Sequence, residues 1–183
     1  MGDISKDFSF KEFMVSRSFP TLAAELTLSR INKYKVYILV KQFLQPLRDA
    51  INEGISDPEL NIPITIESGI RSAPLNVSVG GVNNSDHLFT NAKIAVDFKV
   101  GSLTNNLTAN YLELVFDEFY KSKNLVKQLL YYLPVAGNFF HLSMVDGSAR
   151  EWDIKYCAQR GYDVASRQYF NSLMEANTYV RNL

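Results

Sequence analysis

The periodicity of apolar residues changes along the chain, and this change most restricts the possible fold. Between residues 29 and 52 apolar side chains recur at spacings of three and four, which predicts an amphipathic helix. After residue 61 the segments IPITIESG, AKIAVDFKV, LVKQLLYYL and NFFHLSM predict strands, with a helix over NYLELVFDEFY between them. Helices followed by strands indicate an α+β fold, with N-terminal helices packed on a small, mainly antiparallel sheet. The helical stripe consists of Tyr37, Val40, Leu44, Leu47 and Ile51.

Several local signals refine this arrangement. SFKEFM, at residues 9–14, predicts a short helix that Ser9 and Glu12 close with a capping box. Pro46 interrupts the long helical stripe, so it either kinks that helix or marks the start of its last turns. The aromatic and polar residues after position 157 predict one terminal helix. We therefore expect a domain over residues 1–157 and a C-terminal helical extension over residues 158–183.

Composition excludes several classes of protein. The 183 residues are 46% hydrophobic, enough to bury the core of one domain. Nineteen basic and nineteen acidic residues give no net charge, so we expect no electrostatic surface for nucleic acid or anionic lipid. Cys157 is the only cysteine, which excludes an internal disulfide and a thiolate zinc cluster. Without a secretory signal or a membrane-length apolar run, we expect synthesis in the cytoplasm and no membrane insertion.

The chain has two histidines, His87 and His141, and both need an explanation. A lone histidine is usually a buried imidazole that a backbone carbonyl satisfies. The alternative is that His87, Asp97 and His141 converge on a zinc ion. Imidazole nitrogen and carboxylate oxygen are ordinary zinc ligands, and three of them leave a catalytic position open. Spacing along the chain does not decide between these interpretations.

Residues 68–87, SGIRSAPLNVSVGGVNNSDH, closely resemble a motif of the zinc D-alanyl-D-alanine carboxypeptidases and the related endopeptidases of phage endolysins, peptidase family M15. The resemblance continues through Ala95 and Asp97 to the strand around His141. ISKDFSFKEFMVS and FLQPLRDAI are also similar to family helices, so the resemblance covers about residues 4–156.

The resemblance implies a role for each site residue. His87, Asp97 and His141 match the zinc ligands, which favours the zinc interpretation over two core histidines. Arg71 matches an arginine that holds a substrate carboxylate, a catalytic and substrate-binding role suited to a planar guanidinium. Ser85 is expected to donate to substrate. The alternatives are an Arg71 that ties loops together and a Ser85 that caps its loop.

The chain departs from the family pattern at three points. Ten positions separate His87 from Asp97, where the family usually has seven, and Ile70 replaces a tyrosine. The family glutamate that accepts a proton from water is also replaced. Asn138 stands three residues before His141, and Tyr132 stands at the alternative position on the preceding strand. Neither side chain is a carboxylate base.

These observations lead to two functional hypotheses. The first is a zinc metallopeptidase-like protein that acts on or binds bacterial peptidoglycan stem peptides, as a cell-wall hydrolase of phage or bacterial origin. The second is a catalytically impaired family member that serves as a structural or cell-wall-binding component of a virion or tail. We expect homo-oligomer or virion assembly through residues 158–183, and a protein that is virion-associated or released by lysis.

Overall fold

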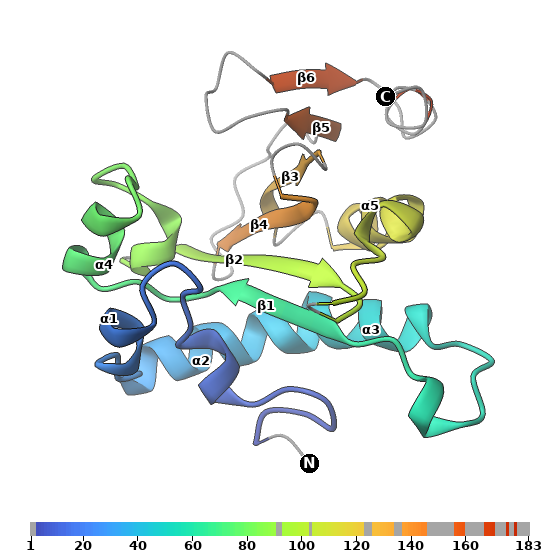
Figure 1. Cartoon of the computed structure of the whole chain (residues 1–183), viewed down its shortest axis with the longest axis horizontal. Coiled ribbons are helices and arrows are strands. Elements are labelled where there is room, and N and C mark those ends of the chain that lie inside the picture. Colours follow the sequence, from blue (N-terminus) through green and yellow to red (C-terminus); the bar gives the residue numbers. More distant parts are fainter. Residues whose placement is uncertain are drawn as a thin grey trace.

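The computed structural model describes residues 3–90, 93–102, 104–122, 126–133, 137–145, 156–159 and 167–170, together with Glu175 and Thr178. It contains helices packed on a mainly antiparallel sheet, which confirms the α+β prediction (Figure 1). No helix among the described residues is both long and apolar enough to cross a bilayer.

The elements follow the predicted order. The helices are α1 (Pro20–Ala24), α2 (Arg30–Leu39), α3 (Gln45–Ile51), α4 (Ala73–Ser78) and α5 (Leu112–Lys121). The shorter turns are η1 (Phe10–Phe13), η2 (Val40–Leu44), η3 (Pro58–Leu60), η4 (Asp86–Leu88) and η5 (Thr108–Tyr111). The strands are β1 (Ile64–Ser68), β2 (Lys93–Val100), β3 (Val126–Tyr132), β4 (Phe139–Val145), β5 (Tyr156–Gln159) and β6 (Arg167–Phe170).

The strands form one sheet in the order β1-β2-β4-β3-β5-β6. All neighbouring pairs are antiparallel except β3 and β5, which run parallel. Asp97 of β2 lies opposite His141 of β4 and beside Ser68 of β1. The sheet therefore brings together residues that are far apart along the chain.

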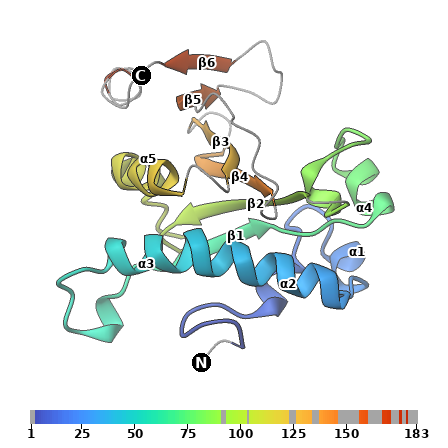
Figure 2. The ribbon, with the colours of Figure 1, turned by 180° about the vertical axis from the view of Figure 1, so that it is seen from behind.

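The two faces of the central strands differ in polarity. In β2, Ile94, Val96, Phe98 and Val100 are buried in the core. Phe98 packs against Phe43 of the long helix, with ring centroids 6.2 Å apart. Figure 2 shows α2 and α3 in front of β1 and β2. Because side chains alternate along a strand, Asp97 faces away from these helices.

Pro46 lies inside a continuous helix that runs from α2 through η2 to α3. η2 is a π-helical turn, and it precedes the proline directly. Pro46 has no N–H to donate to the carbonyl of Gln42, four residues earlier. The hydroxyl of Ser122, after α5, donates to that carbonyl at 3.0 Å instead. Pro46 lies in the first turn of α3, so the alternative that it marks the start of the last turns is confirmed.

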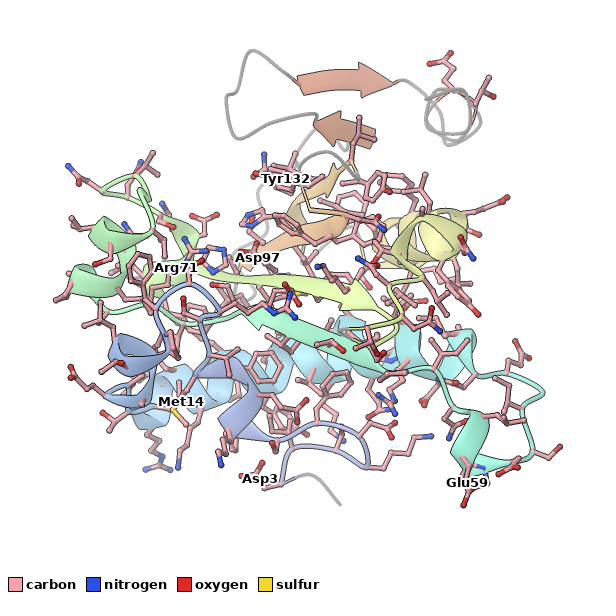
Figure 3. All side chains as sticks on the ribbon, in the orientation of Figure 1. Asp3, Met14, Glu59, Arg71, Asp97 and Tyr132 are labelled. Carbon is pink, nitrogen blue, oxygen red and sulfur yellow. The ribbon has the colours of Figure 1, made fainter. Side chains whose placement is uncertain are left out.

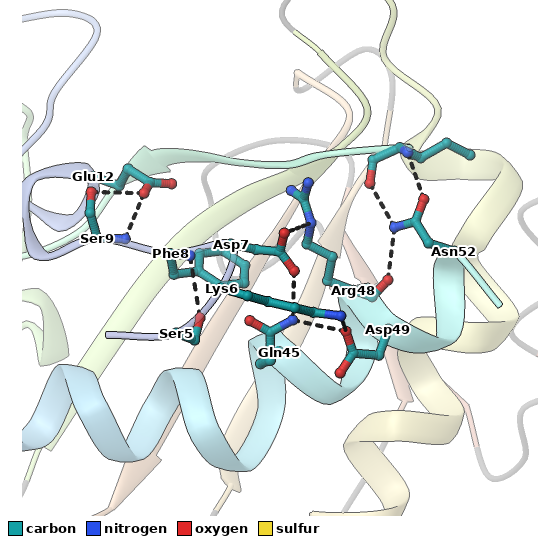
Figure 4. Close-up of polar contacts among 11 residues, drawn as sticks. Ser5, Lys6, Asp7, Phe8, Ser9, Glu12, Gln45, Arg48, Asp49 and Asn52 are labelled. Atoms are coloured by element: carbon teal, nitrogen blue, oxygen red, sulfur yellow. Dashed lines mark hydrogen bonds and ion pairs between the residues drawn. The ribbon is translucent and has the colours of Figure 1, made fainter. Parts of the chain in front are cut away.

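The N-terminal segment is fastened to α3 by polar contacts (Figure 4). Gln45 Nε2 donates to Asp7 Oδ2 at 2.7 Å and to Asp49 Oδ1 at 2.9 Å. The predicted capping box is present, because Glu12 Oε1 accepts from the Ser9 amide at 2.7 Å. The helix it caps is the 3₁₀ turn η1, which ends at the buried Phe13.

Two predictions need correction. Tyr37, placed in the buried helical stripe, is 43% exposed, because the stripe that meets the sheet runs through Val36, Leu39 and Val40. Residues 167–170, placed in a terminal helix, form β6 and pair with β5. The division of the chain at residue 157 stays a prediction; Cys157 itself lies in β5, which pairs with β3. Apart from Glu175 and Thr178, which are helical, the expected helix beyond residue 170 lies outside the described residues.

Candidate metal centre and cleft

The three predicted metal ligands lie together. His87 comes from η4, and Asp97 and His141 are cross-strand neighbours on β2 and β4. His87 Nε2 lies 3.3 Å from His141 Nδ1 and 3.3 Å from Asp97 Oδ1. His141 Nδ1 lies 2.7 Å from the same Asp97 oxygen. One atom of each side chain therefore points to a common position.

The end of β1 fixes the orientation of His87. His87 is only 3% exposed, and its Nδ1 lies 2.7 Å from the carbonyl oxygen of Gly69. A carbonyl can only accept, so Nδ1 carries the proton and Nε2 keeps a lone pair directed at Asp97 and His141. Gly69 is required here, because a Cβ at this position would lie 2.3 Å from the Phe13 carbonyl oxygen.

Arg71 holds the other side of Asp97. Its Nη2 lies 3.1 Å from Asp97 Oδ2, and its Nε donates to Ser68 Oγ at 3.1 Å. Its amide also donates to the His87 carbonyl at 2.7 Å. Figure 3 labels Arg71 and Asp97 beside one another above β1 and β2. Arg71 therefore ties the loop, the strand and one ligand together, while its role towards substrate stays a prediction.

Burial and charge shift the pKa values at this centre. Burial lowers the pKa of His87, partly opposed by Asp97. Burial alone would raise the pKa of Asp97, but the interaction with the adjacent His87 ring and the hydrogen bond from His141 hold it well below its usual range. The centre thus combines an ionised carboxylate with a His87 that resists protonation, the forms in which these groups bind a metal.

The donor set fits a small divalent cation. The described residues include a group of three possible ligands, His87, Asp97 and His141. Tetrahedral zinc with bonds of about 2.0–2.1 Å places neighbouring ligand atoms about 3.3 Å apart. Two of the three separations equal that value, and the third is a hydrogen bond that an ion would replace. The Gly69 carbonyl supplies the usual outer partner of a ligating histidine.

The centre opens into a cleft of about 930 Å³, large enough for part of a peptide. Three carboxylates among the described residues line this cleft. Asp97 belongs to the centre itself, Asp86 pairs with Lys93 at 3.4 Å, and Glu67 pairs with Arg17 at 2.8 Å.

Glu67 has one unusual feature. It occupies an irregularity in β1, between Ile66 and Ser68, where the register against β2 shifts. Its Oε2 forms ion pairs with Arg17 at 2.8 Å and with Lys99 at 3.5 Å. Within the described residues its Oε1 is buried without a hydrogen-bond partner. Glu67 is therefore a cleft carboxylate with one oxygen still able to accept a hydrogen bond.

The two positions at which the sequence comparison expects a replaced family glutamate differ in location. Tyr132 lines the cleft, and its ring stacks on Phe139 with centroids 4.4 Å apart. Asn138 does not line the cleft. It has a left-handed backbone, with φ of 52°, and its Oδ1 accepts a 2.8 Å hydrogen bond from the hydroxyl of Tyr131. Burial raises the pKa of Tyr131 to about 12, so this phenol stays neutral.

Ser85 caps η4, because its Oγ accepts from the His87 amide at 3.3 Å. It also lines the cleft, and its role towards substrate stays a prediction. Sequence reasoning missed Lys35, whose ammonium is buried and donates to the Phe89 carbonyl at 2.5 Å. Nothing in the sequence distinguishes Lys35 from the exposed lysines of the same helix.

Comparison with known families agrees with this geometry. The family model described as Peptidase M15 matches residues 21–123, more than half of the chain. The match includes Arg71, His87 and Asp97, whereas His141 lies beyond it and reaches the centre through the pairing of β4 with β2. The searches of curated proteins and of solved structures each gave no significant match. The chain belongs to the peptidase M15 family.

Proposed function

We propose that this protein is a zinc-dependent peptidase-like protein that acts on the stem peptides of bacterial peptidoglycan. The observation that carries the proposal is the convergence of His87 Nε2, Asp97 Oδ1 and His141 Nδ1 at a cleft, in a chain of this family. When bound, zinc supplies a Lewis acid that polarises a carbonyl and lowers the pKa of a water molecule.

The remaining residues have distinct tasks in this proposal. Asp97 is held by Arg71 on one oxygen, which leaves Oδ1 for the ion. Arg17 and Lys93 are cleft cations whose side chains are 46% and 30% exposed. Stem peptides carry carboxylates, which these two cations are suited to attract. Ser85 and Arg71 are the other candidates for substrate contact.

The state of the cleft carboxylates predicts a low rate of peptide hydrolysis. Asp86 and Glu67 are each paired with a cation, and Tyr132 stands where relatives carry a glutamate. A proton acceptor of suitable basicity commonly contributes about 10²–10⁴-fold to the rate. We therefore expect weak or absent hydrolysis by the parent protein. This supports the second candidate, a cell-wall-binding component of a phage particle that retains the metal and binds the wall without cutting it.

Metal content tests the centre, and peptidoglycan tests the function. Purified protein should contain about one zinc per chain, and His141→Ala and Asp97→Asn should abolish this stoichiometric zinc. Asp117→Asn is the matched control, because Asp117 is an exposed aspartate on α5. Equal zinc in the parent and in His141→Ala would refute the metal centre.

Digestion separates the two candidate functions. Incubation with purified peptidoglycan, followed by measurement of released peptides, detects a peptidase. Co-sedimentation with the same material detects binding without cleavage. Zinc-loaded protein that neither cuts nor sediments with peptidoglycan would refute both candidates while leaving the metal centre intact.

A further inference from the structure

Exposed large apolar side chains are concentrated on the outer face of α2. Three of the six large apolar side chains that are exposed in the described part of the chain lie on this helix. Ile31 is 69% exposed, Tyr34 is 60% exposed and Tyr37 is 43% exposed. Their inner neighbours pack on the sheet, so these three side chains are not needed for the core. An exposed group of this kind usually marks an interaction site.

Cations surround these apolar side chains. Arg30, Tyr34, Tyr37 and Lys41 follow one another at spacings of four, three and four, so all four form one stripe along the exposed side of the helix. Lys33 is exposed on the flank of the stripe. We call these residues the α2 face, namely Arg30, Ile31, Lys33, Tyr34, Tyr37 and Lys41.

The positive charge of the α2 face is not neutralised locally. No acidic residue occurs between Glu25 and Asp49 in the sequence. Within the described residues, no salt bridge joins Arg30, Lys33 or Lys41 to a carboxylate. Instead, the Lys41 ammonium lies over the ring of Tyr37, 5.8 Å from its centroid. The zero net charge of the chain therefore conceals a basic surface at this helix.

We propose that the α2 face docks the protein on the surface of an anionic lipid bilayer. Basic side chains attract anionic headgroups, and tyrosine and isoleucine side chains gain from partial burial at the boundary with the acyl chains. A purely polar polyanion would satisfy the cations but offer little to the three apolar side chains. The cations and the apolar side chains of the α2 face therefore both indicate a lipid surface.

The docking is peripheral, and it leaves the cleft accessible. Val36, Leu39 and Val40, on the inner side of the helix, are fully buried, so α2 cannot insert further without unfolding. Asp97 and the cleft lie on the sheet face opposite to the one that the long helix covers. A protein held on a bilayer by the α2 face presents its cleft away from the lipid. This inference goes beyond the proposed function and does not depend on it.

Vesicle binding tests the proposal with the full chain and without peptidoglycan. Co-sedimentation should detect binding to vesicles of phosphatidylcholine with about one third phosphatidylglycerol, and little binding to phosphatidylcholine alone. Each cation near such a surface contributes about fivefold, so R30Q/K41Q should bind roughly 25-fold more weakly at low salt. Y34S/Y37S should also bind more weakly. The control K6Q/K121Q makes the same change in charge elsewhere and should bind like the parent.

Three results would overturn the proposal. One is equal binding by R30Q/K41Q and the control, with both folded by circular dichroism. Another is no binding to anionic vesicles by the parent. The third is unchanged binding by Y34S/Y37S together with complete competition by inorganic polyphosphate, which would identify a polar polyanion as the partner. None of these results bears on zinc content or peptidoglycan digestion.

Discussion

A glutamate at position 132 should raise the rate of peptide hydrolysis, whereas a glutamate at position 138 should not. Asn138 stands three residues before His141, and Tyr132 stands on the preceding strand. The sequence alone therefore does not show which of the two positions could supply the base. Tyr132 lines the cleft, but the Asn138 side chain turns to Tyr131. Only Tyr132→Glu therefore introduces a carboxylate among the residues that line the cleft.

The structure also sets the expected magnitudes. A base that accepts the proton of the attacking water should raise the rate of Tyr132→Glu about 10²–10⁴-fold. The same substitution removes the ring stacking between Tyr132 and Phe139, which lowers the stability of the fold by about 0.5–1.5 kcal/mol. The backbone at position 138 is left-handed, and glutamate lacks the preference of asparagine for that conformation. The substitution Asn138→Glu therefore costs about 1–2 kcal/mol of stability from the backbone alone. Loss of the partner of the Tyr131 hydroxyl adds about 1–3 kcal/mol. Together these losses lower the melting temperature of a chain of this size by roughly 4–20 °C.

The assay compares parent, Tyr132→Glu, Tyr132→Gln and Asn138→Glu, all loaded with zinc, on one preparation of peptidoglycan. Tyr132→Gln has nearly the shape of the glutamate variant without its charge, so it controls for loss of the tyrosine ring. Released amines give the rate, and thermal unfolding gives the stability. We expect activity to rise only in Tyr132→Glu, and the largest loss of stability in Asn138→Glu.

Rapid hydrolysis by the parent, unchanged in Tyr132→Glu, would refute this reasoning. The protein would then already hold a base, and Glu67 is the residue to test because its Oε1 is buried without a partner among the described residues. A loss of activity in Glu67→Gln at unchanged zinc content would identify that base. Activation by Asn138→Glu would equally refute the placement of the Asn138 side chain.

Three further predictions concern the support of the centre. Gly81→Ala should cost about 1–3 kcal/mol by thermal unfolding, because its Cβ would lie 2.2 Å from the buried Asn76 Oδ1, and an unchanged melting temperature would contradict this. Arg71→Lys should weaken zinc binding about 10–100-fold in a chelator competition, since lysine cannot bridge Ser68 and Asp97; unchanged affinity with a raised KM would mean that Arg71 acts on substrate alone. Metal-free protein should lose stability as the pH falls below about 6.5, because burial lowers the pKa of His87 and the unfolded chain takes up the proton first. The low pKa of Asp97 adds a second loss as the pH falls below about 4, and a melting temperature independent of pH would exclude both effects.

Much of the fold follows from local patterns. The strands around Ile66 and Val96 were predictable, because a sheet with one buried face requires alternation. The long helix was predictable from its spacing, but the placement of Tyr37 was wrong. The π-helical turn at Val40–Leu44 shifts the angular position of residues on either side, so one continuous stripe does not describe both halves.

The strand β6 was not predictable from the sequence, for a different reason. RQYF has no strong alternation, and its pairing with β5 is a tertiary contact that a local pattern does not report. The ligand triad was predictable because the family resemblance supplied it. The contacts that hold it were not, since the Gly69 carbonyl has no sequence signal and the partner of Arg71 depends on how β1 and β2 align.

The attachment of His87 has a consequence for how such proteins diverge. The Gly69 carbonyl and the Arg71 amide hold His87 at the end of β1, whereas Asp97 is fixed within β2. The number of residues that join these two ligands is therefore free to drift over generations, by insertion or deletion, while the ligand atoms keep their separation. A search for distant homologues that demands a fixed histidine-to-aspartate interval would discard chains like this one. A search keyed to the glycine and arginine after the first strand would retain them.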